Sequence, residues 1–282
     1  MLKNEIQEKT GLTRKAIEYY EEKGLIKPLK LENGYRDYSD KDLEILNKIS
    51  LFRKIGLSIS EIEECLSSNG SSLASILRRK EHQLEIEQKR KEVIELIVKK
   101  VNQNIIESKI ALIEAEESIY EKLENAFPGY FGQLIFSAYQ PFLNETLDKK
   151  GQDAFKDFVT YLDNLPSFTL RKEEQEYIEE VSSTYNMKTL IEVNASKIEA
   201  IENAEKWLEE NKDIIAQYQD YKNSDEYQNS PMKNIQDKLQ KFMLDNQYYE
   251  TAIPFIRKFS KSYDEYYQKL LVANDKYIEL NK

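Results

Sequence analysis

The distribution of glycine and proline constrains the fold of this chain more than any other feature of its sequence. The 282 residues include only 8 Gly and 6 Pro, and neither type occurs between Gly70 and Pro128. After Gly151 there is no further Gly. Because these residues interrupt helices and mark turns, long stretches without them favour helix, whereas all-β folds need many turns. The sequence therefore predicts an all-α protein with strands confined to one small β-hairpin.

The same breakers divide the chain into domains. Gly11, Gly24, Gly34 and Gly56 follow one another at short intervals, which indicates short helices and a tight turn in the first sixty residues. We expect a compact domain over residues 1–70, one long helix over residues 71–124, and a helical domain over residues 125–282.

Composition excludes several classes of protein. Hydrophobic residues make up 40% and charged residues 33% of the chain, which is too apolar for a disordered protein and too polar for a membrane protein. Residues Met1 to Gln7 contain no apolar stretch of the kind found in signal peptides, so a cytoplasmic location is expected. The single Cys excludes a disulfide framework and suits a reducing compartment.

The single Cys and His also limit metal chemistry and catalysis. Cys65 is expected to be a buried small hydrophobe and His82 a surface residue on the long helix. We therefore expect neither metal or redox sensing nor a bound cofactor. An enzyme is not expected either, because residues 125–282 contain no His, no phosphate-binding loop and no metal-ligand spacing.

Charge is unevenly distributed along the chain. The net charge is −10, yet residues 1–60 hold 12 Lys+Arg against 10 Asp+Glu, or +2, so residues 61–282 carry −12. An excess of two cations is weak evidence for nucleic-acid binding, so the positions of the cations along the chain are more informative than their number.

The first forty residues fit a helix-turn-helix unit. A short helix over residues 4–9 is ended by Gly11, Thr13 is an N-cap, and a second helix over residues 14–23 is stopped by Gly24. The second helix of such a unit enters the DNA major groove by its first residues, here Thr13, Arg14 and Lys15. Two cations and a hydroxyl suit phosphates and base edges, although they also suit a solvated helix start.

A β-hairpin and two helices follow. Asn33-Gly34 is a strong hairpin turn signal, and it places Arg36 where a wing contacts the phosphate backbone. Ser39 is expected to cap a third helix that runs to about Ile55, and Ser58 or Ser60 a fourth helix over residues 61–66. Helix-turn-helix followed by a hairpin predicts a winged helix.

These residues resemble a known family. The stretch from Thr10 to Leu66 is similar to the DNA-binding domain of MerR-type bacterial transcription regulators, in the family's order and spacing. The matching runs are Thr10–Thr13, Tyr19–Ile26, Asn33–Ser39 and Ile55–Ile62. The resemblance implies that Thr13 and Lys15 face the groove. It also implies DNA contacts for Tyr19, Tyr20 and Lys23, and on the wing for Tyr35 and Arg36 with Tyr38 behind them.

Two positions depart from the family pattern. Glu18 stands where the family commonly has Arg before the Tyr-Tyr pair, and an acid there repels phosphate but can accept from a cytosine amino group. Lys15 replaces the usual Arg after the cap and loses its bidentate geometry. The operator sequence of relatives is therefore not transferable to this chain.

Residues 73–124 contain no breaker and carry apolar heptad rows. The first row is Leu77, Leu84, Lys91, Val98, Ile105, Leu112 and Ile119, and the second is Ile94, Val101, Ser108 and Ala115. A helix of this length, about 78 Å, needs a partner to cover its apolar face. The resemblance implies an antiparallel coiled-coil homodimer, with Leu84, Ile94, Val98, Val101, Ile105 and Leu112 at its seam. An intramolecular helical hairpin remains the alternative.

Aromatic residues concentrate in the C-terminal part. Residues 129–282 hold 14 of the 19 Tyr and 9 of the 11 Phe. Helices are expected at about 133–148, 152–164, 171–185, 187–222 and 231–278, the last with a break near Pro254. The stretch from Asn125 to Asn144 is uncharged, but its Pro and Gln residues favour a buried helix or a pocket wall over a membrane span.

The resemblance implies that this domain senses a small molecule. An acidic, tyrosine-rich domain suits hydrophobic or cationic compounds, although the aromatics also suit an ordinary core. The candidate ligand-binding residues are Tyr130, Gln133, Tyr139, Tyr249 and Tyr267. Family members distort a promoter whose spacer is too long, so RNA polymerase is affected indirectly, through double-stranded DNA. The alternative is a DNA-binding regulator whose C-terminal domain binds a protein or is only structural.

Overall fold

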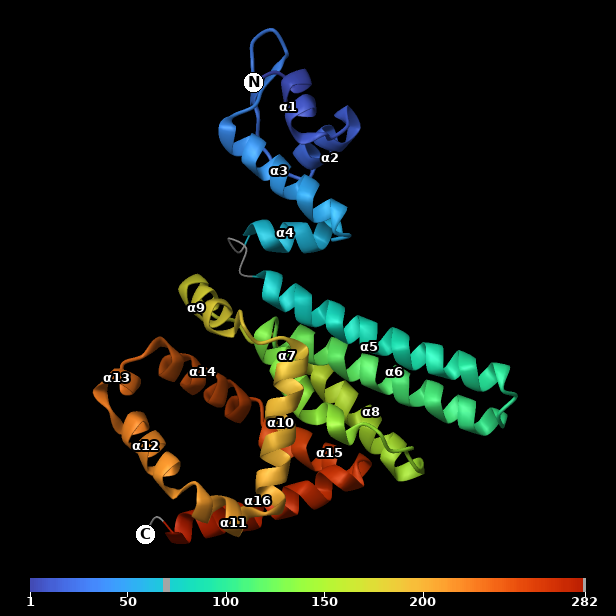
Figure 1. Ribbon diagram of the computed structural model, residues 1–282, viewed down its shortest axis with the longest axis vertical. Coiled ribbons are helices and arrows are strands. Elements are labelled where there is room, and N and C mark those ends of the chain that lie inside the picture. Colours follow the sequence, from blue (N-terminus) through green and yellow to red (C-terminus); the bar gives the residue numbers. More distant parts are fainter. Residues whose placement is uncertain (68–71, 281–282) are drawn as a thin grey trace. The chain divides into compact units, whose positions relative to one another are not determined.

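The computed structural model describes residues 1–67 and 72–280, and the expected domain boundary at residues 70 and 71 lies outside them. The described chain forms two compact units, Met1–Ile76 and Leu77–Lys282. The second unit therefore contains most of the expected dimerisation segment together with the C-terminal helices. Figure 1 shows helices throughout and strands only in the first unit, as predicted for an all-α protein with a hairpin.

The first unit has the element order of a winged helix. Its elements are α1 (Lys3–Thr10), α2 (Arg14–Glu22), β1 (Leu29–Lys30), β2 (Arg36–Asp37), α3 (Asp40–Lys54) and α4 (Ile59–Ser67). The expected caps are in place: the Thr13 hydroxyl accepts from the Ala16 N–H at 3.2 Å, and the Ser39 hydroxyl from the Asp42 N–H at 3.1 Å. Ser58 is the cap of α4, since its hydroxyl accepts from the Glu61 N–H at 3.3 Å.

The wing is a short antiparallel ribbon. Leu29 pairs with Asp37 and Lys30 with Arg36, and the connecting turn is closed by the Leu31 N–H, which donates to the Tyr35 carbonyl at 2.8 Å. Gly34 has φ of +82°, a conformation that residues with a Cβ rarely adopt. The Asn-Gly turn was therefore predicted correctly.

Aliphatic side chains fill the core of the first unit. Ile6, Ile17, Leu46, Ile49 and Ile62 are fully buried, and each comes from a different turn of helices α1 to α4. Cys65 is 2% exposed and belongs to the same cluster, as expected. Burial raises the pKa of the Cys65 thiol to about 11.

The expectation of one helix over residues 71–124 was wrong. The chain instead forms α5 (Ser72–Val98) and α6 (Gln103–Ala126), joined by a turn. Lys100 has φ of +55°, and the Asn102 side chain accepts from the Asn104 N–H at 2.9 Å to start α6. The arms lie side by side in Figure 1, and Lys89 and Arg90 of α5 pair with Glu116 and Glu117 of α6. Residues 72–126 therefore form an intramolecular helical hairpin, and the homodimer stays a prediction.

The C-terminal helices are shorter and more numerous than expected. They are α7 (Tyr130–Tyr139), the 3-10 turn η1 (Gln140–Phe142), α8 (Lys149–Asn164), α9 (Lys172–Ser182), α10 (Met187–Glu202), α11 (Ala204–Glu210), α12 (Lys212–Asn223), α13 (Asp225–Gln228), α14 (Pro231–Asp245), the π-helical turn η2 (Tyr248–Ala252), α15 (Ile253–Phe259) and α16 (Lys261–Leu280).

Two of the expected helices are interrupted. The expected helix over 187–222 is broken at Asn203 and Asn211, and the one over 231–278 at Gln247 and Ser260 rather than near Pro254. Gln247 has φ of +53°, which no helix interior tolerates. Pro254 instead lies in the first turn of α15, where its missing N–H costs nothing.

Aromatic side chains fill the core of the second unit. Helix α15 packs on α8, α6 on α7 and α8, and α10 on α7 and α16. Edge-to-face ring pairs join further elements: Phe127 at the end of α6 with Phe242 of α14, and Phe142 of η1 with Tyr263 of α16, with centroids 5.5 and 5.3 Å apart. Gly132 of α7 allows a close approach, because a Cβ there would lie 2.5 Å from the Phe127 carbonyl oxygen.

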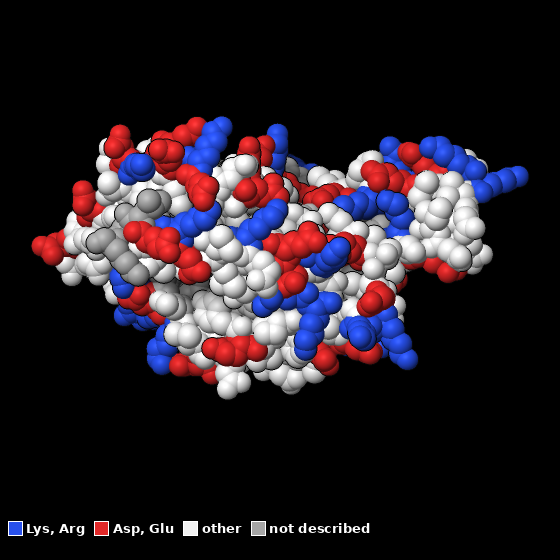
Figure 2. Space-filling view, turned by 90° about the horizontal axis from the view of Figure 1, so that it is seen from below, with Lys and Arg blue, Asp and Glu red and all other residues white. Residues whose placement is uncertain are grey.

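The uncharged stretch from Asn125 to Asn144 is packed inside the second unit. Phe127 and Phe136 are fully buried, as expected for a core helix or pocket wall. In the part of the chain that the structure describes, no helix is both long and apolar enough to span a bilayer. On the face drawn in Figure 2, acidic and basic side chains are mixed, with uncharged areas between them.

Candidate functional site

The N-terminal end of α2 presents the predicted hydroxyl and cations to solvent. Thr13, Arg14 and Lys15 are all exposed, and Tyr19 and Lys23 continue this surface one and two turns later. The Lys23 ammonium lies 5.7 Å from the centre of the Tyr19 ring. This surface can donate hydrogen bonds to an anionic backbone from both ends of the helix.

Carboxylates hold two of the predicted DNA-binding cations. The Glu18 carboxylate accepts from the Lys3 ammonium at 2.9 Å and from the Arg14 guanidinium at 3.0 Å. These two hydrogen bonds, the Lys3 bond first, lower the pKa of Glu18 to about 2. On the wing, Arg36 donates to both carboxylate oxygens of Glu21 at 2.9 and 3.1 Å. Glu18 therefore orients Arg14, and Glu21 orients Arg36.

The aromatic residues predicted to contact DNA divide into two groups. Tyr19 and Tyr35 are 40% and 64% exposed. Tyr20 and Tyr38 are only 5% and 1% exposed, because they share a face with Ile17 and Ile49 in the core. Burial raises the pKa of Tyr38 to about 12. Tyr20 and Tyr38 thus pack beneath the surface that Tyr19 and Tyr35 form, and their contact with DNA stays a prediction.

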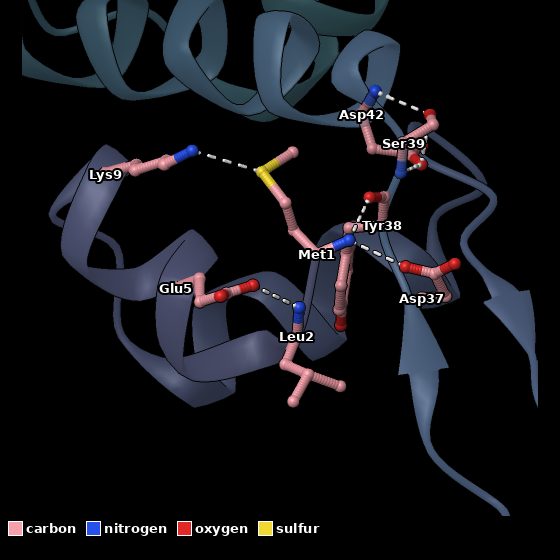
Figure 3. A network of polar contacts seen from close by, with 8 residues as sticks. All are labelled: Met1, Leu2, Glu5, Lys9, Asp37, Tyr38, Ser39 and Asp42. Atoms are coloured by element: carbon pink, nitrogen blue, oxygen red, sulfur yellow. Dashed lines mark hydrogen bonds and ion pairs between the residues drawn. The ribbon is translucent and has the colours of Figure 1, made fainter.

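A polar network fixes the base of the wing. The Met1 ammonium donates to the Asp37 carboxylate at 2.6 Å and to the Tyr38 carbonyl at 2.8 Å, as Figure 3 shows. In return the Tyr38 N–H donates to the Met1 carbonyl at 2.9 Å. The start of α1 and the end of β2 are therefore held together, which sets the angle at which the wing leaves the core.

The predicted dimer residues lie on the α5–α6 hairpin. Leu84, Ile94, Val98 and Ile105 are 70%, 60%, 76% and 50% exposed, whereas Val101 and Leu112 are half-buried. Together with Leu77 and Ile97, the four exposed residues give the hairpin a solvated apolar surface on both arms. Exposed apolar surface of this extent is typical of a protein contact.

The five candidate ligand residues do not form one site. Gln133 is fully buried between Arg78 and Glu124, and the Tyr139 hydroxyl is bonded to that of Tyr248 at 2.6 Å. Tyr130 packs beside Arg78, and Tyr267 beside Arg257 with 4.8 Å between the guanidinium carbon and the ring centre. Tyr249 is 45% exposed.

A cavity of about 420 Å³ lies elsewhere in the second unit, and none of those five residues lines it. Its walls come from α6, η1, the loop before α8, α8 and α15. The apolar lining includes Phe142, Phe155 and Phe259, and the acids are Glu114 and Glu145. None of the described residues that line it is basic. Such a cavity suits a ligand with an apolar body and a positive charge.

A buried polar cluster in the hairpin was not predicted. His82 is 3% exposed, so its expected surface position was wrong; its ring stacks on Tyr120 with centroids 3.9 Å apart. Burial lowers the pKa of His82 to about 4. Glu85, Lys89, Glu116 and Gln140 surround it with mutual hydrogen bonds. The i, i+3 spacing of His82 and Glu85 was the only available sequence signal.

Comparison with known proteins gives matches at the N-terminal end. Residues 3–69 match the family described as MerR HTH family regulatory protein. The chain is 45% identical over 65 residues to the HTH-type transcriptional regulator CueR of Salmonella typhi, which covers 23% of this chain and 47% of that protein. It is 41% identical over 63 residues to the regulator HmrR of Rhizobium leguminosarum bv. viciae, covering 22% and 49%.

A longer match is to CueR of Vibrio cholerae serotype O1, 38% identical over 95 residues, which covers 32% of this chain and 68% of that protein. The chain spans about half the length of the first relatives that it matches. No solved structure matches it. These matches, over a unit that has the element order of a winged helix, show that the chain belongs to the MerR HTH family of regulatory proteins.

Proposed function

We propose that this chain is a homodimeric transcription regulator that binds double-stranded promoter DNA and answers to a small hydrophobic cation. The first unit docks α2 in the major groove and the wing on the phosphate backbone. Distortion of the promoter then acts indirectly on RNA polymerase. The dimer has two conformations, and the ligand binds one of them more tightly in the C-terminal domain. A ligand shifts such an equilibrium only through this difference in affinity.

The exposed start of α2 is the observation that carries the DNA-binding part of the proposal. Thr13, Arg14 and Lys15 lie on solvent while the apolar side of the same helix, with Ile17, faces the core. Arg36 extends this cationic surface onto the wing. Relatives matched over this unit are transcriptional regulators by name.

Lys15→Ala and Arg36→Ala test this interface. Each variant should weaken binding to the chain's own promoter fragment and reduce the slope of log K against log [salt] by about 1, as expected for one lost phosphate contact. Lys48→Ala is the matched control, because Lys48 is an exposed cation of α3 that pairs along its own helix with Glu44. Unchanged slopes in both test variants would remove these residues from the interface.

The exposed apolar surface of the hairpin supports the homodimer. Leu84, Ile94 and Val98 on α5 and Ile105 on α6 leave apolar area in water that a second copy would cover. Val98→Glu combined with Ile105→Glu should give monomers by light scattering, because it places unpaired charge in an apolar contact. A double variant that stays dimeric would mean that another surface holds the two copies.

The 420 Å³ cavity supports the sensor part of the proposal, although its lining does not include the five residues suggested by sequence. It combines aromatic walls with the Glu114 and Glu145 carboxylates. The Glu145 carboxylate also accepts from the Lys261 and Ser262 N–H groups at 3.2 and 2.8 Å, and so caps α16. Glu114 is exposed and is the carboxylate best placed to meet a cationic ligand.

Tetraphenylphosphonium and tetraphenylborate provide a matched pair of probes, because they share shape and differ in charge. We expect calorimetry of the full chain to show binding of the phosphonium and at least about tenfold weaker binding of the borate. Glu114→Gln should reduce this preference, and Phe155→Ala should weaken both. Glu107→Gln, an exposed acid of α6 outside the cavity, is the control. Equal affinity for both ions would refute a cation site.

The second candidate is a regulator whose C-terminal domain binds a protein or is only structural. The exposed aromatics on α11 and α12, Trp207, Tyr218 and Tyr221, favour it. Absence of binding of both probes to the wild-type chain, together with a melting temperature that neither probe changes, would support this candidate over the sensor.

A further inference from the structure

The buried cluster in the α5–α6 hairpin contains the donor atoms of a metal site. One ligand atom each from His82, Glu85 and Glu116 can be chosen so that all lie within 4.8 Å of one another. His82 and Glu116 are 3% and 4% exposed, so two of these groups are removed from bulk water. Ligands around one ion stand roughly 3 to 4 Å apart, so small side-chain rotations would close the set.

Two buried polar atoms beside this cluster have no hydrogen-bond partner among the described residues. They are Nδ1 of His82 and Oε1 of Gln140. The Gln140 amide is held at the cluster, because its Nε2 donates to both Glu85 oxygens at 2.9 Å and to Glu116 at 3.0 Å. Rotation of this amide by half a turn would bring Oε1 to the position that Nε2 now occupies beside Glu85 and Glu116. Unpaired buried acceptors of this kind call for an explanation, and a bound ion is one.

Lys89 supplies the positive charge that the carboxylates require. Its ammonium lies 2.6 Å from Glu116 and 2.9 Å from Glu85. Two carboxylates and one ammonium leave the cluster with a net charge of about −1. The Lys89 side chain is 31% exposed, so its ammonium has a path to solvent. The cluster is therefore built to hold a cation that can be exchanged.

We propose that His82, Glu85, Glu116 and Gln140 bind one divalent transition-metal ion, which replaces the Lys89 ammonium. The ligands are an imidazole nitrogen, two carboxylate oxygens and an amide oxygen. Among the described residues, the cluster contains no thiol. This donor set suits Mn²⁺ or Zn²⁺ and does not suit soft Cu(I). The ion would join α5, α6 and η1, and none of its four ligands lines the cavity described above.

The test uses the full chain, freed of metal and titrated with MnCl₂ and with ZnCl₂ by calorimetry. We expect about one ion per chain and at least about tenfold weaker binding by Glu116→Gln. Glu117→Gln is the matched control, since Glu117 is the next residue of α6 and pairs with Arg90 on the surface. Binding that survives unchanged in Glu116→Gln would come from surface acids and would overturn the proposal.

Lys89→Met separates a metal site from a plain ion-pair network. Removing the competing ammonium should tighten metal binding by about tenfold or more. Metal should also raise the melting temperature of Lys89→Met more than that of the wild type, because the two carboxylates are otherwise left uncompensated. If neither protein binds Mn²⁺ or Zn²⁺, the cluster is an ion-pair network and the proposal fails.

The single histidine gives a direct reading of the site. His82 is the only His in the chain, so its imidazole signals in the NMR spectrum are unambiguous. Substoichiometric Mn²⁺ should broaden these signals in the wild type and not in Glu116→Gln. Sharp imidazole signals in wild-type protein that has bound Mn²⁺ would place the ion elsewhere.

Discussion

The two units of this chain differ in what their cores contain. In the first unit the fully buried side chains are mostly aliphatic, such as Ile6, Leu46 and Ile62, and the buried polar groups are small hydroxyls and carboxylates. In the second unit aromatic rings surround fully buried polar groups, chiefly Arg78 and Gln133. Since apolar burial has no direction, buried hydrogen bonds are what can select a particular packing of many helices.

The contacts of Arg78 illustrate this difference. Its guanidinium donates to Gln133 at 2.5 Å and to the carbonyls of Ser182 and Tyr185 at 3.2 and 2.8 Å. One side chain of α5 therefore joins α7 and the end of α9. The first unit has no buried cation of this kind among its described residues.

Of the substitutions considered, replacement of Arg78 should destabilise the second unit the most. Arg78→Met keeps much of the volume but leaves Gln133 and two carbonyls without their donor, which should cost about 3–5 kcal/mol of unfolding free energy. The free energy of unfolding is measured by urea denaturation, monitored by circular dichroism. Arg79→Met is the control, because Arg79 is partly exposed and pairs with Glu124. Equal stability of the two variants would mean that burial of Arg78 does not matter.

Gly132→Ala tests how closely the helices of the second unit pack. The added Cβ would meet the carbonyl oxygens of Phe127 and Leu123 at 2.5 and 2.7 Å, which are backbone atoms that cannot move aside. We expect a loss of about 1–3 kcal/mol in the same unfolding experiment. Gly151→Ala meets only side chains, at 3.3 Å or more, and should be close to neutral. A neutral Gly132→Ala would show that α7 can shift.

Ser39→Ala tests the local signals that shape the first unit. It removes the cap of α3 and the hydrogen bond from the Ser39 hydroxyl to Asp42 at 2.7 Å. The expected loss is about 1 kcal/mol, typical of a helix cap. Ser196→Ala is the control, since its hydroxyl only bonds back to the Glu192 carbonyl on an exposed face. A loss as large as that of Arg78→Met would contradict the contrast between the units.

The smallest effect is expected at Cys65, which reports on the first unit without altering it. Its thiol pKa of about 11 and its burial keep it protonated and covered at pH 8. Because the folded pKa lies above the unfolded one, this contribution to stability is present at neutral pH and is lost only as pH rises toward 11. A thiol reagent at pH 8 should react on unfolding in urea and not before. Rapid reaction of the folded chain would show that α4 opens locally.

The same contrast decides how much of the fold the sequence could predict. The caps at Thr13 and Ser39 and the turn at Gly34 were predicted, because each depends on a few neighbouring residues. The turn after Val98 was missed, because Lys100 adopts a left-handed conformation without being Gly. An Asn at position 102, a good N-cap, was the one available sign of it.

The candidate sites divide in the same way. Arg14 and Lys15 are exposed as predicted, because the period of α2 fixes which side is buried. Tyr139 and Gln133 were assigned to a ligand site, and the structure instead uses them inside the core, bonded to Tyr248 and Arg78. Those partners lie 109 and 55 residues away in sequence, so no local pattern could indicate them.

The turn between α5 and α6 has a consequence for chain connectivity. Lys99 and Lys100 are exposed, and exposed turns with lysines are where proteases such as trypsin cut. The arms on either side are joined by the ion pair of Lys89 with Glu116 and by the contact of Ile86 and Val93 with Ile113. A chain nicked at this turn should therefore stay associated as two fragments, and the hairpin can be labelled or split there without separating its arms.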